Sequence, residues 1–564
     1  MPPAATTSVL SSLPLRSADC PGHDAERRAA REPRRAEDTV LYRVVRDNLE
    51  TFLEHVRQQY EKPLPRYVLQ EFHRFLDCGV FARGFSRWHC DRCGHDLILP
   101  FSCKTRGLCP SCGARRMAET ASHLVDRVLP NVPLRQWVLT LPYELRLLAA
   151  QRADVVRAFS RIFIDTLFTS QRGRSGRPGA QCGGVSFVSR AGGAVNLNIH
   201  FHDLVLDGVY EREGDQAVFR RVVAPRPEDL SWVVRRFGER ALRWLRRQGL
   251  LDGRCREERS NESDQGTALD ACAQLALRFG PLETVGHRGR PAPGEDEEAS
   301  FSPRPGGRWS AEWEGFRVHA GVRIATGDDE GREQLCRYAS RPGIALGRMT
   351  LLDDGRIAYR VRHPFGPHGM HRVMTPIEFL TRLAAIVPPP RYPLQTYYGV
   401  LAPASKWRAA VVPHSPSDAA LPARACPQDP RDARTDRSPL GKDRASEPLA
   451  RSPDTSARPI VSTGLSLLVP SLGDDPEAPP NVITVRHWRR LLDGLLLARS
   501  PRLDWATLLR RSMNIDALDC PRCHGRLRAL DVVTDEDDAR RILQAAGLPT
   551  EPPPRARARD PTDE

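Results

Sequence analysis

The chain has 564 residues, of which 40% are hydrophobic and 27% are charged. Because domains usually contain about 100 to 200 residues, this length excludes a single small module and predicts several domains. No apolar run approaches the roughly 18 residues of a membrane span, and the N-terminal segment lacks the features of a secretory signal. We therefore expect a soluble cytoplasmic protein with no membrane partner. In that reducing compartment its 14 cysteines should be metal ligands, redox groups or buried apolar side chains.

The charge balance favours a polyanionic partner. Lys and Arg number 84 against 70 Asp and Glu, which gives a formal net charge of +14. All but four of the basic residues are arginine, and the chain has 49 prolines. This bias is typical of GC-rich coding sequences and weakens the inference from charge. Arginine nevertheless suits phosphate recognition, since its planar guanidinium group binds two oxygens at once.

The hydrophobic pattern predicts the elements in chain order. Apolar residues at helical spacing follow a polar leader and mark a first helix over 42–60. After a cysteine-rich stretch at 78–112, the pattern predicts a helix over 116–129, a strand over 136–141, a helix over 154–168, strands over 184–190 and 194–206, helices over 230–248 and 269–279, a strand over 316–325 and a short helix that ends before Pro342. Glycines between the strands at 184–190 and 194–206 indicate a hairpin.

This mixture of hairpins and flanking helices predicts an α+β fold with a largely antiparallel sheet. Composition divides the chain into a disordered leader (1–39), a helix with a cysteine-rich domain (40–130), a sheet domain (131–412) with a disordered insert (about 282–308), a disordered linker (413–480), a small C-terminal module (481–548) and a disordered tail (549–564).

The cysteine-rich stretch has the spacing of a zinc ribbon. Two C-x2-C pairs, Cys90 with Cys93 and Cys109 with Cys112, are 15 residues apart, which is within the range for a four-cysteine zinc site. Four thiolates leave no open position, so the Zn²⁺ would be structural. Two further cysteines could replace a member of this quartet, and four basic residues flank it. The alternates are Cys78 and Cys103, and the flanking residues, which we expect to bind DNA, are Lys104, Arg106, Arg115 and Arg116. A purely architectural ribbon is the alternative.

The C-terminal module contains one further pair, Cys520 and Cys523, with His524 next to it. A lone C-x2-C pair is a weaker signal than two. We interpret it as a candidate second zinc site in a zinc-ribbon-like module. It would be completed by His524 and a distant ligand, or it is the remnant of a ribbon. Merely buried thiols are the alternative.

Two motifs of the sheet domain carry chemistry. In the strand that ends at His200-Phe201-His202, apolar residues alternate with polar ones, so both imidazoles lie on one face and can share a metal ion. Two histidines that bind no metal are the alternative. Further along, Tyr338 lies at the end of a short helix between Arg337 and Arg341. A tyrosine that attacks phosphorus needs its phosphate held and neutralised, which a metal ion and guanidinium groups can do.

Zinc-ribbon cysteines, a His-hydrophobic-His strand and an Arg-Tyr-x-x-Arg-Pro segment follow one another in this order. The order resembles the rolling-circle insertion-sequence transposases of the IS91 group, in the HUH superfamily. The likeness extends to the Cys-Lys-x-Arg-x-x-Cys-Pro-x-Cys segment at 103–112, to Tyr-Tyr-Gly-Val-Leu-Ala-Pro at 397–403 and to the cysteine pair at 520–525. The leader, the insert and the linker contain no motif of the group.

The resemblance implies an HUH nuclease domain at 131–412 and a metal-dependent transposase that nicks and rejoins single-stranded DNA at element ends and at target DNA. His200 and His202 would bind Mg²⁺ or Mn²⁺, and Tyr338 would form a covalent 5′-phosphotyrosine. Arg337 and Arg341 would contact the DNA. Because the covalent link conserves the energy of the phosphodiester, we expect no nucleotide cofactor.

The likeness leaves some points open. Two histidines are a poor site for a six-coordinate ion, so a third ligand is expected, and His319 is our first candidate, ahead of Asn198 and Asp203. Two-tyrosine members of the group have a second tyrosine where this chain has Gln334, which favours the single-tyrosine branch. A rolling-circle replication initiator or relaxase with the same chemistry, and a non-catalytic zinc-ribbon regulator that binds DNA, are the alternatives.

Overall fold

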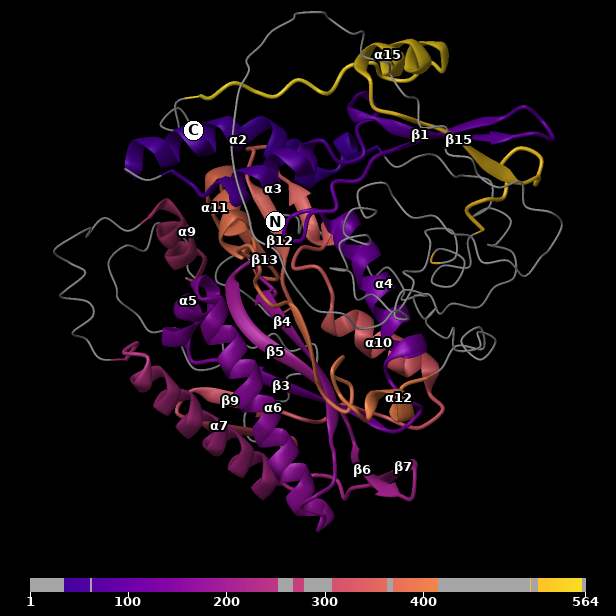
Figure 1. Cartoon of the computed structure of the whole chain (residues 1–564). Helices are drawn as coiled ribbons and strands as arrows, with labels where there is room; N and C mark the ends of the chain where they lie inside the picture. Colours follow the sequence, from indigo (N-terminus) through magenta and orange to yellow (C-terminus); the bar gives the residue numbers. More distant parts are fainter. Residues whose placement is uncertain are drawn as a thin grey trace, which may run out of the picture. The chain divides into compact units, whose positions relative to one another are not determined.

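The structure is a computed structural model of the whole chain (Figure 1). It describes residues 35–60, 63–251, 267–277, 307–362, 369–413, 508 and 516–559. Residues 1–34 of the expected leader, most of the insert and almost all of the linker lie outside the described residues. Among the helices that the structure describes, none is long and apolar enough to cross a membrane.

A seven-stranded antiparallel sheet forms the centre of the molecule. Its strands are β3 (Leu134–Thr140), β4 (Gly183–Ala191), β5 (Leu197–Leu206), β8 (Ser310–Trp313), β9 (Phe316–His319), β10 (Arg323–Ile324) and β14 (Gln395–Gly399). The strand order is β14-β4-β5-β3-β9-β8, and β10 pairs with β3. Strands β4 and β5 are antiparallel neighbours, which confirms the expected hairpin. The expected strand over 316–325 is interrupted, because only its two ends pair with β3.

Both faces of β5 are covered, and every residue of this strand is buried. Leu197, Ile199 and Phe201 point into the largest hydrophobic cluster, whereas Leu204 and Leu206 point into a second cluster on the opposite face. We expected the apolar residues of this strand to face the core and the two imidazoles to lie on the other face. Instead, successive residues of β5 point alternately into two buried layers, one on each face of the sheet.

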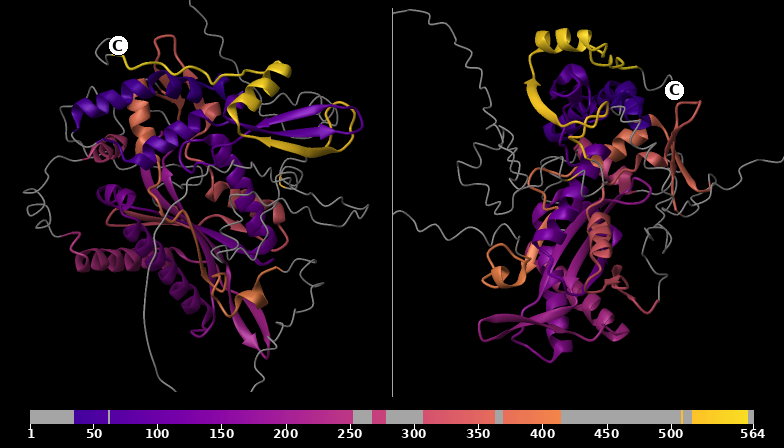
Figure 2. Two further views of the ribbon diagram at one scale, coloured as in Figure 1. Left: turned by 45° about the horizontal axis from the view of Figure 1, so that its top comes forward. Right: turned by 90° about the vertical axis from the view of Figure 1, so that its right-hand side faces the viewer.

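Helices pack on both sides of the sheet. The helices described are α2 (Val40–Gln59), α3 (Arg66–Leu76), α4 (Pro110–Arg127), α5 (Tyr143–Gln151), α6 (Ala153–Ser175), α7 (Pro227–Arg247), α9 (Ala268–Leu277), α10 (Asp329–Ala339), α11 (Pro376–Ile386), α12 (Arg408–Val411) and α15 (Glu536–Ala545), with 3-10 turns at Ala36–Asp38, Phe81–Arg83 and Leu346–Arg348. Side chains of α5, α6 and α7 fill the first cluster, and those of α4 and α10 fill the second. Figures 1 and 2 show the ribbons of these helices beside the strands of the sheet. The sheet with its two histidines therefore lies between helical layers.

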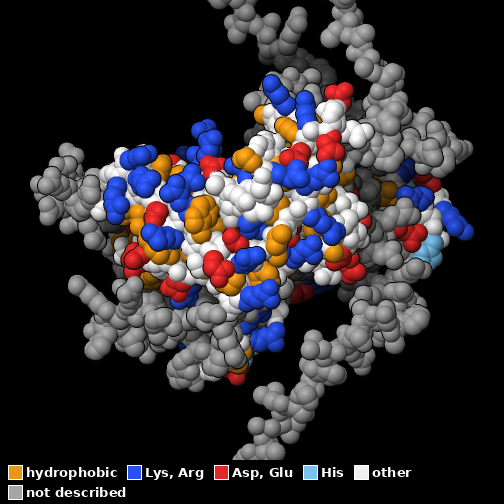
Figure 3. Space-filling model, turned by 90° about the horizontal axis from the view of Figure 1, so that it is seen from below, with side chains coloured by type: hydrophobic (Ala, Val, Ile, Leu, Met, Phe, Trp, Pro, Cys, Tyr) orange, Lys and Arg blue, Asp and Glu red, His pale blue; other side chains and the backbone are white. Residues whose placement is uncertain are grey.

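Three smaller sheets complete the described fold. They are β15-β1-β2, made of β1 (Phe85–Cys90), β2 (Asp96–Pro100) and β15 (Leu527–Val533); β11-β12-β13, made of β11 (Met349–Leu351), β12 (Ile357–Arg360) and β13 (His371–Met374); and the hairpin of β6 (Gly208–Glu213) and β7 (Gln216–Arg221). Figure 3 views the molecule from below, where basic side chains are scattered among acidic and apolar ones and form no continuous stripe.

The N-terminal helices share the core of the sheet domain. The first cluster contains Leu41, Phe52 and Phe72 from α2 and α3 together with Phe159 and Phe201 from the sheet domain. The domain boundary that we expected at residue 130 crosses this cluster. Because the side chains are packed together, the N-terminal helices stabilise the sheet domain directly.

The expected disordered tail is ordered as far as Arg559. The Arg559 backbone N–H donates to Thr51 Oγ1 (3.1 Å), and its guanidinium group donates to the Asp47 carbonyl (3.0 Å). Arg555 contacts Nδ1 of His73 (2.8 Å). The tail segment therefore runs along α2 and α3, and Figure 1 shows it above these helices.

One buried acid lies on the opposite face of β5 from the histidines. Asp203 is fully buried. Burial raises its pKa to about 8, and the hydroxyl of Ser186, its cross-strand neighbour, partly opposes this shift. The folded protein therefore holds a proton on Asp203 at neutral pH, whereas the unfolded chain releases it near pH 4.

The first prediction follows from this linkage. Between roughly pH 4 and 8 the folded state binds the extra proton, so Asp203 should lower the free energy of unfolding by up to about 1.4 kcal/mol for each unit that the pH rises. Asp203→Asn cannot ionise, so the difference in Tm between variant and wild type should grow in favour of the variant from pH 5.5 to 8. Calorimetry at both pH values measures it, and a pH-independent difference would contradict the assignment.

Candidate functional site

The two histidines of β5 lie side by side on the face that α10 covers. His200 and His202 are each 4% exposed, and their ring centroids are 4.9 Å apart. The Nδ1 atom of His200 is 3.0 Å from the Asn198 carbonyl oxygen, and the Nδ1 atom of His202 is 2.9 Å from Nε2 of Gln136. Nδ1 of each ring therefore has a polar neighbour, which fixes the orientation of the ring.

Electrostatics keep one ring of this pair neutral. The pKa of His202 lies well below its usual value because of burial first, and then because of the neighbouring His200 and the positive charge of Arg341. A neutral imidazole is the form that binds metal ions. His202 is therefore neutral at physiological pH, the form in which an imidazole can bind a metal ion.

Tyr338 reaches the pair from the last turn of α10. Its ring centroid is 5.4 Å from that of His202, with the two rings nearly perpendicular. The guanidinium carbon of Arg341 lies 4.7 Å from the centroid of the Tyr338 ring. These motifs are more than 130 residues apart in the chain, and the fold brings them together in one place.

The second arginine of this motif is engaged elsewhere on the helix. Arg337 forms an ion pair with Glu333, with 2.6 Å between Nη2 and the carboxylate. Gln334, at the position of the second tyrosine in two-tyrosine relatives, is exposed and donates a hydrogen bond to Glu330. Of the two arginines, Arg341 is the one in contact with the tyrosine ring.

His319 does not join the histidine pair. It shares their face, because Val138 lies between His202 and His319 in the paired strands. Its Nδ1 is 2.9 Å from the Trp309 carbonyl oxygen, and its Nε2 accepts the Gly321 N–H at 3.2 Å. Both ring nitrogens are thus used within the β8–β9 region, and the expectation of His319 as third ligand has no support in this geometry. Asp203 lies on the other face of β5, away from the two histidines.

Two buried amide oxygens on the same face as the histidine pair could serve as the further ligands that a six-coordinate cation needs. Asn198 Oδ1 and Gln136 Oε1 are both buried, and neither has a hydrogen-bond partner within the part of the chain that the structure describes. Asn198, His200 and His202 alternate along one face of β5, and Gln136 contacts His202 from β3. Buried polar oxygens without a partner are costly, so the donor set fits a divalent cation that accepts nitrogen and oxygen ligands. The sequence offered no signal for Gln136.

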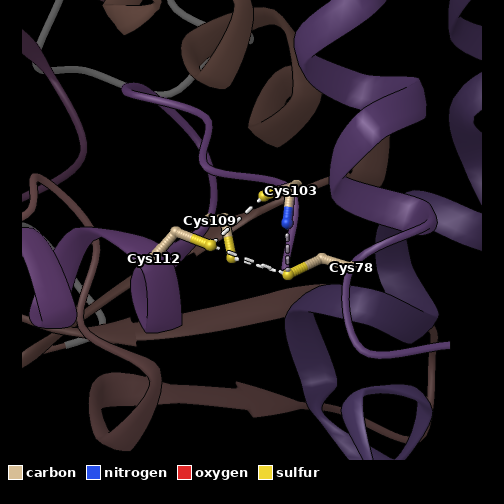
Figure 4. A group of neighbouring side chains, drawn as sticks. All are labelled: Cys78, Cys103, Cys109 and Cys112. Carbon is tan, nitrogen blue, oxygen red and sulfur yellow. Dashed lines mark hydrogen bonds between the residues drawn. The ribbon is translucent and has the colours of Figure 1, made fainter. Parts of the chain in front are cut away.

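Four cysteines form a cluster at the start of α4 (Figure 4). Sulfur–sulfur distances are 3.8 Å between Cys78 and Cys112, 3.6 Å between Cys109 and Cys78, and 3.5 Å between Cys103 and Cys112. Four sulfurs bonded to one zinc at roughly 2.3 Å would be about 3.8 Å apart, whereas a disulfide bond is about 2.05 Å long. This set, which we call the first cysteine set, has the size of a tetrahedral zinc site.

The expected quartet is wrong in its membership. Cys90 and Cys93 do not join Cys109 and Cys112, and they group instead with Cys520 and Cys523 in a second cysteine set. The hairpin of β1 and β2 separates the Cys90 turn from α4, so Cys78 and Cys103 complete the first set. The sequence did contain a hint of this arrangement, because these eight cysteines are enough for two four-cysteine sites.

The first cysteine set is attached to the helix that supports α10. Cys109 caps α4 and Cys112 lies in its first turn. Helices α4 and α10 pack side by side (Figure 1), and a Cβ on Gly113 would lie 2.8 Å from Cβ of Pro342. Glycine is therefore needed at residue 113 for this approach. The cysteines anchor a helix that touches the segment just after Tyr338.

Some of the flanking basic residues are engaged with the protein itself. Arg106 donates to the Pro389 carbonyl (3.2 Å), Arg116 donates to the Lys104 carbonyl (3.1 Å), and Arg115 pairs with Glu119 at 3.4 Å. The Lys104 side chain is exposed on a residue with φ of 54°. The positive charge around the first cysteine set is thus partly offset by local partners.

Comparison with known families agrees with this geometry. A model described as a transposase zinc-binding domain matches residues 46–141, and a model described as a putative transposase matches residues 183–408. The first match contains the entire first cysteine set, and the second contains the histidine pair and Tyr338. No curated protein and no solved structure matches the chain.

A zinc-binding N-terminal region joined to a transposase domain defines a DNA-processing protein of the transposase class. The two matches together cover more than half of the chain, and it belongs to the IS91 family of transposases. The resemblance noted in the sequence is thereby confirmed.

The second prediction concerns the first cysteine set. Cys103→Ala should remove one zinc ion per chain, because three thiolates bind zinc less tightly than four. The same variant should increase hydrogen exchange in both α4 and α10, since α4 loses its anchor. Cys272→Ala, a buried cysteine of α9 outside both sets, is the matched control. Unchanged zinc content in the Cys103 variant would contradict the assignment.

Proposed function

We propose that this transposase nicks and rejoins single-stranded DNA at the ends of its insertion sequence, and at target DNA, through a covalent bond to Tyr338. The observation that carries the proposal is the contact of Tyr338 with His202 on one side and Arg341 on the other. A nucleophile, a neutral metal-binding imidazole and a guanidinium group converge there. Phosphoryl transfer requires such a combination.

The chemistry of the step balances without a co-substrate. The phenolic oxygen of Tyr338 forms a bond to phosphorus while the bond from phosphorus to the 3′-oxygen breaks. The phenol loses its proton, and the departing strand leaves with a 3′-hydroxyl group. The 5′ end stays on the tyrosine as a phosphodiester, so attack by another 3′-hydroxyl reverses the step without ATP.

Residues of the sheet would hold the cation and position its ligands. His200 and His202 would bind Mg²⁺ or Mn²⁺ through Nε2, with the amide oxygen of Asn198 as third protein ligand in place of His319. Such an ion polarises the phosphate and stabilises the charge on the leaving oxygen. Imidazole donors favour Mn²⁺ over Mg²⁺.

Gln136 acts on His202 as a positioning residue. For Nε2 to bind a metal ion, the proton of the neutral ring must be on Nδ1, which then needs an acceptor. The Gln136 amide contacts Nδ1, and a rotation of this amide by 180° presents Oε1 to it, because the two ends have nearly the same shape. His200 already has such an acceptor in the Asn198 carbonyl.

Arg341 serves the phosphate as well as the tyrosine. Its guanidinium group lies over the ring, from which it can bind a phosphate oxygen close to the attacking atom. Arg337 and the basic residues around the first cysteine set, of which Lys104, Arg106 and Arg115 are exposed, would contact DNA further away. Their ion pairs with Glu333 and Glu119 can exchange for phosphates, since surface ion pairs are weak.

A replication initiator or relaxase would use the same histidines and tyrosine, and the zinc-binding family match favours the transposase. A non-catalytic regulator would need the cysteines alone. It would have no use for a tyrosine in contact with a buried histidine pair. The single-tyrosine branch is part of our proposal, since Gln334 occupies the other position.

The third prediction tests the nucleophile. Tyr338→Phe removes only the attacking oxygen, so the variant should bind labelled single strands from its element ends as the wild type does and form no covalent adduct. Denaturing gels after incubation with Mn²⁺ measure the adduct. Tyr397→Phe is the matched control, because Tyr397 lies on the edge strand β14 of the same sheet and packs in the same cluster as α10. An undiminished adduct in the Tyr338→Phe variant would show that another residue is the nucleophile.

The fourth prediction tests the role of Gln136. Gln136→Ala removes the acceptor for Nδ1 of His202, so the Mn²⁺ affinity should fall roughly 10- to 100-fold, as is usual when such a partner is lost. Gln136→Glu keeps an acceptor and should restore most of it. His319→Ala should leave Mn²⁺ affinity unchanged, because His319 is engaged within its own hairpin.

Titration with Mn²⁺, followed by electron paramagnetic resonance, gives these affinities without any assay of nicking. The titration distinguishes a positioning residue from a merely structural one. Gln136→Glu should restore the Mn²⁺ affinity only if the side chain at this position orients His202. A loss in the His319 variant as large as that in the Gln136 variant would return His319 to the ligand set.

A further inference from the structure

The second cysteine set joins two parts of the chain that are far apart in sequence. Cys90 Sγ lies 3.5 Å from Cys523 Sγ, and Cys93 Sγ lies 3.6 Å from Cys520 Sγ, across separations of 433 and 427 residues. All four sulfurs lie within 4.8 Å of one another. These distances are too long for disulfide bonds and agree with the edges of about 3.8 Å in a tetrahedral zinc site.

The two C-x2-C turns have the same backbone geometry. The Cys90 carbonyl accepts the Gly94 N–H (2.9 Å), and the Cys520 carbonyl accepts the His524 N–H (3.0 Å). The Cys90 N–H donates to the His95 carbonyl (2.9 Å), and the Cys520 N–H donates to the Gly525 carbonyl (2.7 Å). The two turns therefore present their thiols in equivalent ways.

Backbone strain in the second turn supports a ligand at this place. Gly94 and His524, at equivalent positions of the two turns, have φ values of 67° and 56°. This conformation is easy for glycine but costs a histidine about 1 kcal/mol or more. The His524 side chain is exposed and contacts Asp519, so it is no ligand, contrary to one expectation from the sequence. The strained residue directly follows Cys523 in the turn that carries both thiols.

Other contacts bring these turns together. Strand β15 pairs with β1 from Phe85↔Val533 to Cys90↔Leu527. Helix α15 packs Ala539 and Leu543 against Phe81 and Phe85 at the far end of the sheet from the cysteines. Figure 2 shows β15 beside β1. The C-terminal strand thus completes a sheet whose other strands lie in the N-terminal region.

We propose that Cys90, Cys93, Cys520 and Cys523 bind one structural Zn²⁺ that fastens the C-terminal module (516–559) to the N-terminal region. Four thiolates fill the coordination sphere, so this ion has no open position and no part in the reaction. Residues 520 and 523 lie outside both family matches. The matched zinc-binding region is therefore incomplete without the C-terminal end of this chain.

The test measures zinc in the purified full-length protein, by elemental analysis, and is the fifth prediction. Wild type should contain two zinc ions per chain. The double variants C90A/C93A and C520A/C523A should each contain one, and the quadruple variant that combines them should still contain one, because both pairs hold the same ion. C109A/C112A should lose the other ion, and combining it with C90A/C93A should leave none. Cys272→Ala should keep two.

Several results would overturn the proposal. If Cys90 and Cys93 share an ion with Cys109 and Cys112, the combination of those two double variants would lose no more zinc than either alone. Iron in place of zinc would refute the identity of the ion. Zinc content of two in C520A/C523A would show that the C-terminal pair binds none.

A second experiment keeps the cysteines intact in case the variants fail to fold. A protease site inserted between residues 414 and 499 allows the folded full-length protein to be cut. The C-terminal piece should stay bound with both zinc ions present, and removal of zinc by a chelator should weaken its binding by more than about 100-fold. A C-terminal piece that separates while both ions stay with the larger piece would contradict the proposal. Neither experiment depends on DNA cleavage.

Discussion

Helix α10 covers a face of the central sheet that carries two imidazoles and two amide side chains, and the burial of these polar groups is the constraint on which the site depends. Buried polar atoms are costly unless they have partners. Here the Nδ1 atoms of both rings have partners, while Asn198 Oδ1 has none. The partners of the two Nδ1 atoms offset part of the cost of burial, and Asn198 Oδ1 is left as a possible ligand for a cation.

The position of Tyr338 follows from the packing of helices rather than from the sheet. Helix α4 lies against α10, and Gly113 allows Pro342 to approach closely. Cysteines hold the first turn of α4, so the helix that carries the first cysteine set supports the helix that carries Tyr338. The zinc-binding region and the sheet domain are thus parts of one core, which also explains why a hydrophobic cluster spans residues 41 to 392.

Periodicity in the sequence predicts most of this fold. The helix over 42–60, the strands that became β4 and β5, and the shared face of His200 and His202 depend on local alternation, which the structure shows. Alternation cannot reveal that helix α10 covers the polar face of β5. Alternation also cannot show which C-x2-C turns lie together, because Cys90 and Cys523 are 433 residues apart in the chain. Gln136 was missed because its role depends only on the register between β3 and β5.

The pairing of chain ends in the second cysteine set affects how the protein is made. A ribosome adds about 5 to 20 residues per second, so Cys523 follows Cys90, 433 residues earlier, after roughly 20 to 90 s. During this interval the β1–β2 hairpin has neither its third strand nor the two thiols, Cys520 and Cys523, that complete the second cysteine set. Nascent chains therefore carry an unfinished zinc-binding region until synthesis is nearly complete. A gene copy truncated before codon 520 encodes a protein in which this region is never finished.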